Sequence, residues 1–294
     1  MIFKLIVISL LFFVNTKANT FSTSIGICNL EIYNGKIKNI SEIVELIKFE
    51  TDKLVKIFGI INKRPYSVFI TENMDEFNDK TEGHFPEWGV AIAKKNPDKI
   101  IVKAPGIANI TYKKLKQIII HELNHIYIFR LKYYNTIPGW FKEGFAMYTA
   151  NEFSFSHKIE ISKYIWSKSI LPLNQLININ KIPLQQVKLA YSESAAAVEA
   201  LFFYYGNSIL IDLVQNLNKT NFQKSFLLSS NDELIVFEKK YQEYLKNNYY
   251  WIILFSSPKY IYIILPIFLI LGFIYIRYNN KKILKRWEIE ELEE

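Results

Sequence analysis

The chain has 294 residues, half of them hydrophobic, and its formal net charge at pH 7 is +8. This length accommodates one folded domain of about 220–230 residues together with membrane segments. Outside the predicted membrane segments, the basic residues form no block interleaved with aromatic side chains, which argues against nucleic-acid binding. A single cysteine, Cys28, excludes an intrachain disulfide and a cysteine metal cluster.

Residues 1–18 have the pattern of a signal peptide. Lys4 supplies a positive start, and an apolar run broken only by one serine follows over residues 5–14. Thr16 and Ala18 place small residues at the −3 and −1 positions of a cleavage site. The apolar run is too short to span a bilayer, and an uncleaved anchor is the alternative interpretation.

An N-terminal α/β lobe is predicted over residues 19–110. Apolar spacing and β-branched runs indicate an amphipathic helix, a strand, a short helix and the two strands of a hairpin. In chain order these elements are expected at 38–59, 66–71, 74–79, 88–93 and 99–103.

The next helix, predicted over residues 111–134, carries the most informative motif. Apolar residues recur at steps of three and four, and Thr111 suits the N-cap position. Residues i and i+4 of a helix share a face, so the imidazoles of His121 and His125 converge on one point. Glu122 is placed to hold a water bound there. This H-E-x-x-H spacing is the arrangement of zinc metalloproteases.

A catalytic zinc site takes three protein ligands and keeps one position open. A short loop ending at Pro138-Gly139 predicts a turn into a second helix over 140–152. Folding back in this way brings Glu143 to the two histidines, so we expect Glu143 to be the third ligand and Zn²⁺ to be the metal. Glu152 is the alternative ligand, and a first-turn glutamate favoured by the helix dipole is the other interpretation of Glu143.

Residues 111–248 are predicted to continue as a helical lobe with breaks at its prolines. An Ala-rich helix begins at Tyr191, and further helices are expected at 207–219 and 232–248. The Tyr191 phenol is our candidate donor to an oxyanion, with a core or rim tyrosine as the alternative. His157 is a rival donor.

The C-terminal part predicts one transmembrane segment, over residues 249–278. Residues 260–276 form an uncharged stretch of seventeen, the lower limit for a spanning helix. Aromatic residues flank it, and five basic residues follow within the next ten. The positive-inside rule therefore places the tail, residues 279–294, in the cytoplasm and the main domain outside it. A buried core helix is the alternative.

The two ligand segments resemble those of the gluzincin metallopeptidases, and within them the peptidase MA-like domains. The matching segments are 121–125 and 138–148, with looser matches at 190–194 and 222–245. The resemblance covers about residues 35–248. It implies an α+β, zincin-like fold: a small mixed sheet over an active-site helix, with a helical C-terminal lobe.

The same resemblance implies that an edge strand, here 88–93, pairs with an extended substrate; a plain edge strand is the alternative. Many gluzincins also place an acidic or polar residue one turn after the ligand glutamate, where it orients a ligand histidine. Here that position is Met147. The Gly-x-Met-Glu-Asn signature of the large aminopeptidases is absent, so nothing marks capture of a substrate amino terminus. His84 is expected in a loop.

Taken together, the sequence predicts a membrane-anchored zinc metallopeptidase that hydrolyses peptide bonds outside the cytoplasm. Its expected metal ligands are His121, His125 and Glu143, with Glu122 as the catalytic base and Tyr191 as the oxyanion donor. The expected partners are a peptide or protein substrate and the membrane. The alternatives are a non-catalytic, membrane-anchored zincin-fold binding module and a zinc hydrolase of a non-peptide amide or ester.

Overall fold

The structure is a computed structural model, and it describes residues 16–33, 39–83, 85–86, 89–256 and 258–293. The chain divides into two compact units. The first comprises Met1–Ser154 and Leu171–Tyr241, and the second comprises Phe155–Ile170 and Gln242–Glu294. Residues 155–170 and 242–248, which we expected within the helical lobe, thus group with the C-terminal segment.

The first unit contains a five-stranded mixed sheet with the order β1-β2-β3-β5-β4. Its strands are β1 (Thr16–Thr23), β2 (Gly26–Tyr33), β3 (Tyr66–Thr71), β4 (Ala91–Lys94) and β5 (Lys99–Lys103). The pairs β2–β3 and β3–β5 are parallel, whereas β1–β2 and β4–β5 are antiparallel. The predicted α+β class with a small mixed sheet is therefore confirmed.

The hairpin formed by β1 and β2 was not predicted. It turns at Gly26, whose φ is +138° and whose Cβ position would lie 2.1 Å from the Arg64 carbonyl oxygen. Residues 1–15 of the predicted signal peptide lie outside the described residues. Its last three, Thr16–Ala18, pair in register with residues 31–33 of β2.

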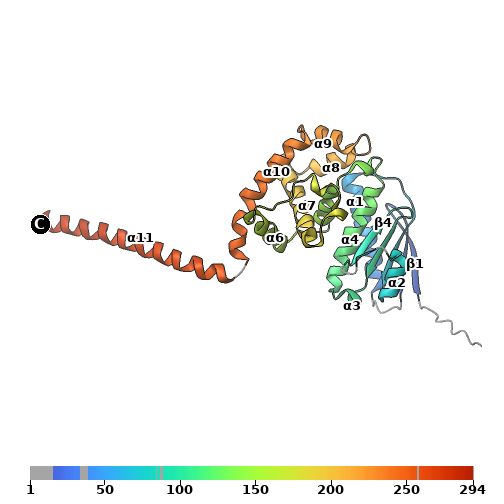
Figure 1. Cartoon of the computed structure of the whole chain (residues 1–294), viewed down its shortest axis with the longest axis horizontal. Coiled ribbons are helices and arrows are strands. Elements are labelled where there is room, and N and C mark those ends of the chain that lie inside the picture. Colours follow the sequence, from blue (N-terminus) through green and yellow to red (C-terminus); the bar gives the residue numbers. More distant parts are fainter. Residues whose placement is uncertain (1–15, 34–38, 84, 87–88, 257, 294) are drawn as a thin grey trace, which may run out of the picture. The chain divides into compact units, whose positions relative to one another are not determined.

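Helices cover both faces of the sheet (Figure 1). The pleat puts Phe69 and Ile101 on one face, where they pack with Phe77 of α2 (Met74–Thr81). Val68, Ile70, Ile100 and Val102 alternate with them and are fully buried. The opposite face is covered by α1 (Ile40–Phe58) and α4 (Tyr112–Phe129), which also pack on each other. A short helix, α3 (Pro105–Ala108), precedes α4.

A buried guanidinium joins the end of α4 to the sheet. The Arg130 Nε donates to Asp98 Oδ2 over 2.9 Å, beside the start of β5. Its two terminal nitrogens donate to the backbone carbonyls of Ile25, in the β1–β2 turn, and Arg64, just before β3. One side chain thereby connects three separate backbone segments to the helix that carries both motif histidines.

The helical lobe of the first unit is built on α5 and α7. Its elements are η1 (Tyr134–Thr136), α5 (Gly139–Thr149), η2 (Gln175–Ile177), η3 (Ile179–Lys181), α7 (Leu184–Tyr205), α8 (Ile209–Asn216), α9 (Phe222–Ser230) and α10 (Leu234–Tyr249). The boundary between the two units falls within α10. The Ala-rich part of α7, residues 195–197, is completely buried, and α5 packs against both α4 and α7.

Gly144 allows α5 and α7 to approach closely. A Cβ at this position would lie 2.2 Å from the Ser194 carbonyl oxygen and 2.7 Å from Val198 Cγ2. We expect Gly144→Ala to destabilise the fold by about 3 kcal/mol, the upper end of the usual overpacking cost, because rigid backbone must move. The midpoint of unfolding measures this effect. Gly106→Ala is the control, since nothing lies within 4 Å of its Cβ position; equal midpoints for the two variants would contradict the argument.

The second unit contains α6 (Phe155–Trp166), η4 (Tyr250–Phe255) and α11 (Pro258–Glu293). The Trp166 indole stacks on Tyr250, with ring centroids 4.8 Å apart, and donates to the Tyr250 carbonyl oxygen over 2.8 Å. The Ser162 hydroxyl accepts from the Ile253 amide over 2.8 Å. These contacts hold α6 against η4.

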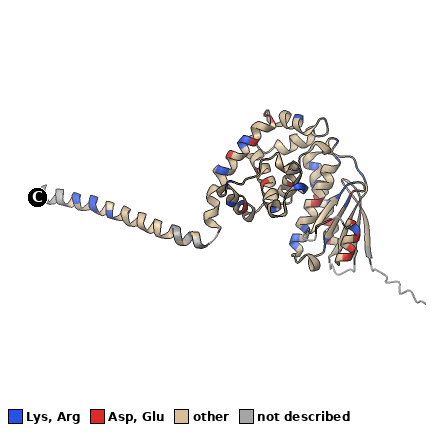
Figure 2. Ribbon diagram, viewed as in Figure 1, with Lys and Arg blue, Asp and Glu red and all other residues tan. Residues whose placement is uncertain are grey.

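Of the predicted membrane segment, residues 258–278 lie in α11, which continues through the predicted tail as one helix, whereas its aromatic start lies at the end of α10 and in η4. The side chains at 261, 263 and 264 lie outside the described residues. Large apolar side chains from Leu265 to Ile276 are exposed, and the Lys and Arg residues of α11 gather in its C-terminal part (Figure 2). Over the described residues, no single helix meets the length and hydropathy expected of a membrane span; α7 and α8 meet it only jointly, bent by 107°.

Candidate metal centre

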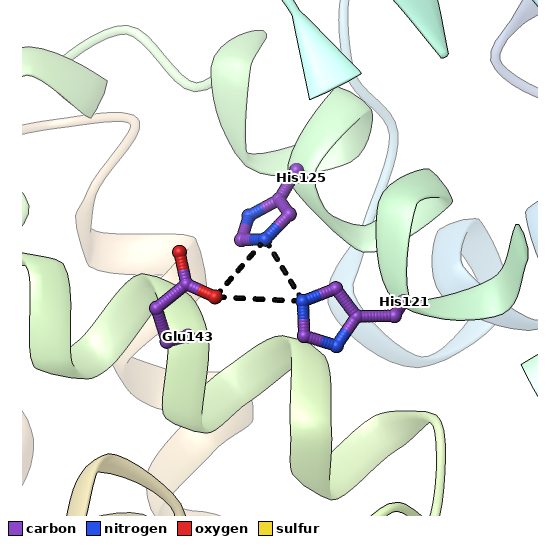
Figure 3. Close-up of side chains that lie close together, drawn as sticks. All are labelled: His121, His125 and Glu143. Atoms are coloured by element: carbon purple, nitrogen blue, oxygen red, sulfur yellow. Dashed lines mark hydrogen bonds and ion pairs between the residues drawn. The ribbon is translucent and has the colours of Figure 1, made fainter. Parts of the chain in front are cut away.

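His121 and His125 lie one turn apart on α4 and face the same point (Figure 3). Thr111 caps this helix, since its side chain accepts a hydrogen bond from the Lys114 amide as predicted. Both imidazoles are largely buried, with 9% of each residue exposed. Their Nε2 atoms are 3.1 Å apart.

Glu143 of α5 completes a three-donor cluster with the two histidines. The chain leaves α4, turns through η1 and starts α5 after Pro138, so that α5 folds back on α4. The Glu143 Oε2 lies 3.4 Å from the Nε2 of His121 and 3.4 Å from that of His125. The predicted second helix is therefore present, although it ends at Thr149 rather than at 152.

The spacing of these atoms fits a zinc ion. Zinc bonds to nitrogen and oxygen of about 2.0–2.1 Å, in tetrahedral geometry, place neighbouring donor atoms about 3.3 Å apart. The three separations in the cluster lie between 3.1 and 3.4 Å. Two imidazoles and one carboxylate are also the donor set of a catalytic zinc site with one open position.

The electrostatics of the cluster favour a positive charge at its centre. Burial alone would lower the pKa of His121, but hydrogen bonds to Glu143 and Glu152 raise it to about 10. Burial alone would raise the pKa of Glu143, but the charge of His125 and hydrogen bonds from both imidazoles hold it well below its usual range. The carboxylates thus stabilise a cation where the donor atoms converge.

Glu152 supports His121 from outside the cluster. Asn151 adopts a left-handed conformation, with φ of 52°, just after α5, and the chain turns there. The Glu152 Oε2 accepts from His121 Nδ1 over 2.8 Å, and its Oε1 accepts from Lys114 Nζ over 2.9 Å. Because Nδ1 is the donor in this hydrogen bond, Nε2 is the nitrogen of His121 that faces the cluster and can bind a metal when the imidazole is neutral.

The hydrogen bond between Glu152 and His121 also explains how this chain can have Met147 where many gluzincins have an acidic or polar residue. Met147 is buried and carries no charge, so it cannot orient a ligand histidine. Glu152 performs that task from nine positions after Glu143, beyond the end of α5. Glu152, our alternative ligand, therefore lies on the outer nitrogen of His121 instead of among the three converging atoms.

Glu122 and Tyr191 both interact electrostatically with residues of the cluster. Glu122 is buried beside the two histidines, and burial, opposed by the histidine charges, raises the pKa of its carboxyl group. The pKa of the Tyr191 phenol is raised by the negative charge of Glu143, by burial and by Glu122. Tyr191 is thus near both carboxylates and keeps its proton. His157 belongs to α6 of the other unit, and His84 lies outside the described residues.

A cavity of about 450 Å³ adjoins the cluster at Glu143. One wall is the segment 135–142, which leads into α5, and another is the segment 173–179 with η2. The lining is completed by Phe222, Gln223, Leu234 and Glu238. Sequence reasoning missed this cavity, because its walls come from segments that are far apart along the chain.

A family comparison identifies the class of protein. The model of the Peptidase MA superfamily matches residues 46–247, which is more than half of the chain. The chain belongs to the Peptidase MA superfamily. The family resemblance drawn from segments 121–125 and 138–148 is thereby confirmed. A search of curated proteins finds no match.

Among solved structures, the chain is similar to crystal structures of an M1 zinc metallopeptidase from Deinococcus radiodurans. The identity is 15% for one of them, with a TM-score of 0.45, covering 78% of this chain and 52% of that chain. A mutant of the same protein bound to a Tyr-Ser-Ala substrate gives 14% identity, a TM-score of 0.47 and coverages of 78% and 52%. This chain spans about half the length of the solved structures that it matches.

Proposed function

We propose that this protein is a zinc-dependent metallopeptidase, with His121, His125 and Glu143 as the metal ligands. The observation that carries the proposal is the convergence of their three donor atoms within 3.4 Å of one another. The buried carboxyl group of Glu122 next to these ligands supplies the second requirement of such a site, a base. Membership of the Peptidase MA superfamily supports the same reaction class.

The residues of the site have complementary tasks in peptide hydrolysis. When bound, zinc supplies a Lewis acid that polarises a carbonyl group and acidifies a coordinated water. Glu122 accepts the proton of the attacking water and passes it to the leaving amine. Tyr191, which stays protonated, donates a hydrogen bond to the oxyanion. Glu152 keeps the Nε2 of His121 free to act as a ligand.

The edge strand β4 is our candidate for holding the substrate backbone. It is the last strand of the sheet, next to β5, and it packs on the ligand helix α4. An exposed strand edge offers backbone groups to an extended peptide, which adds to the sheet as a further strand. Trp88 of the predicted strand lies outside the described residues.

A direct experiment tests the proposed reaction. The purified full-length chain is expected to contain one zinc per molecule by elemental analysis and to cleave members of a peptide library. A chelator should abolish cleavage and added zinc should restore it. Zinc-bound protein that cleaves simple amides or esters but no peptide would exclude a peptidase. The contact of Glu152 with His121 offsets the Met147 departure, which is one of the features that favour the binding-module alternative.

We further propose that residues 260–276 anchor the peptidase domain in a membrane, with the domain outside the cytoplasm. The uncharged stretch, the basic residues after it and the exposed apolar side chains of α11 support this arrangement. A cleavable signal peptide over residues 1–18 would direct the domain across the membrane. Extraction of membranes with alkaline carbonate, combined with protease protection of each terminus, tests the anchor and its orientation.

The support of His121 by Glu152 leads to a separate prediction. Glu152→Ala is expected to weaken zinc binding by about 10–100-fold, the usual effect of losing such an outer hydrogen bond. Competition with a chelator of known affinity measures it. Lys114→Ala is the matched control: it removes the exposed ion pair to Glu152 and an exposed hydrogen bond to Gln117, and should change affinity by about fivefold or less. Equal affinities for wild type and Glu152→Ala would mean that the contact does not orient the ligand.

A further inference from the structure

A cavity lies beside the metal centre. Glu143 belongs both to its lining and to the three-donor cluster, so the cavity adjoins the metal centre at this residue. Its volume of about 450 Å³ lies within the range of typical ligand pockets. All of its lining residues belong to the first unit.

Lys142 is the positively charged residue of this lining. It precedes Glu143 in the first turns of α5 and is half-buried. Among the residues that the structure describes, none forms an ion pair or hydrogen bond with its ammonium group, and Glu143 is the charge that acts on it. A partly buried charge without a partner is costly, and an anionic ligand removes that cost.

The two acidic residues of the lining, Glu143 and Glu238, interact with groups other than Lys142 through hydrogen bonds or ion pairs. The Glu143 Oε2 faces the two imidazoles. The Glu238 Oε1 accepts a hydrogen bond from the Leu173 amide over 3.0 Å. The remaining polar side chains of the lining are amides and one hydroxyl: Asn135, Asn174, Asn178, Gln223 and Thr136. The Thr136 hydroxyl already donates to the Tyr133 carbonyl oxygen over 2.7 Å. An incoming carboxylate therefore meets one free cation together with amide side chains that can donate hydrogen bonds.

We propose that this cavity binds a carboxylate of the peptide substrate close to the scissile bond, and that Lys142 pairs with it. This inference rests on the proposed peptidase function and specifies its substrate class: peptides with an acidic side chain, or with a free C-terminal carboxylate, beside the cleaved bond. A charge-assisted hydrogen bond in a partly enclosed site strengthens binding by roughly tenfold or more.

Equilibrium binding tests this pairing without requiring turnover. The full-length Glu122→Gln variant, loaded with zinc, is titrated with matched peptides that carry either glutamate or glutamine at one position and either a free or an amidated C-terminus. We expect a carboxylate-bearing peptide to bind about tenfold more tightly than its amide counterpart. A difference between the glutamate and glutamine peptides would identify a side-chain carboxylate as the ligand, and a difference between free and amidated peptides would identify the C-terminal carboxylate. Equal affinities across the set would overturn the inference.

Substitutions then assign the preference to one residue. Lys142→Met should abolish it, and Lys142→Glu should favour peptides with lysine in place of glutamate; a merely structural role would not produce that reversal. Lys224→Met, which removes an exposed charge near the cavity, should leave the preference intact. Zinc content is measured for each variant, because Lys142 neighbours a ligand. A preference that survives in zinc-loaded Lys142→Met would refute the assignment.

The outcomes separate this inference from the function on which it rests. Peptide cleavage by the wild type without a carboxylate preference would contradict only the inference. Absence of cleavage by zinc-loaded wild type, with the binding preference present, would contradict the proposed hydrolysis and leave the carboxylate site supported.

Discussion

Glu122→Gln is expected to keep its zinc and to lose about 10²–10⁴-fold in kcat, the usual contribution of a general base. Glutamine has nearly the same shape as glutamate, and Glu122 is not among the three converging donor atoms. The substitution therefore removes proton transfer and leaves the ligands in place. Steady-state cleavage of a library-derived peptide measures the loss, and elemental analysis measures the zinc.

The control for this variant is Glu45→Gln, which changes an exposed glutamate of α1 by the same chemistry. It should retain wild-type activity. If Glu122→Gln cleaves the peptide at the wild-type rate, another group acts as the base. Zinc loss in this variant would instead place Glu122 among the groups that hold the metal.

Glu143→Ala has the second large expected effect, on the metal itself. Removing one of three ligands leaves only the two imidazoles, so zinc affinity should fall by more than the roughly 100-fold that loss of an outer partner causes. Peptide cleavage should disappear with the metal. Zinc content after dialysis against a weak chelator is the measurement.

Because Glu143 lies next to Gly144 and close to α7, folding of the Glu143→Ala variant needs its own check. Circular dichroism and the unfolding midpoint, both in the presence of zinc and without it, provide one. Zinc retained at the wild-type level would show that the third ligand lies elsewhere in the chain. Glu152→Ala, which alters an outer contact, should show a smaller loss than Glu143→Ala.

The converging cluster could be predicted because its determinants are local. A spacing of four residues on a capped helix fixes how His121 and His125 lie relative to each other, and a proline-glycine turn shortly afterwards favours a second helix that returns. Glu143 then meets them from the start of that helix. The lengths of α1, β3 and α2 were close to those predicted, for the same reason.

The features that were missed depend on tertiary context. Glu152 can accept a hydrogen bond from His121 because the chain turns at Asn151, which has a left-handed backbone conformation. The residue type of Asn151 alone does not predict that turn. The cavity requires four segments that are distant in sequence to come together, and the sequence pattern of each one indicates only a loop or a helix. The hairpin of β1 and β2 was not predicted because its first three residues also fit a signal-peptide cleavage site. We therefore assigned them to the signal peptide and not to a strand.

The three backbone segments connected by Arg130 have a practical consequence for dissecting this protein. The family match starts at residue 46, yet the carbonyl of Ile25 accepts from the Arg130 guanidinium at the end of the ligand helix. A fragment limited to the matched region would lack the Ile25 carbonyl that accepts a hydrogen bond from Arg130, and its sheet would lack strands β1 and β2. The smallest cooperative unit that holds the ligand helix therefore extends upstream of the recognised homology, to include at least residues 19–33 of the β1–β2 hairpin.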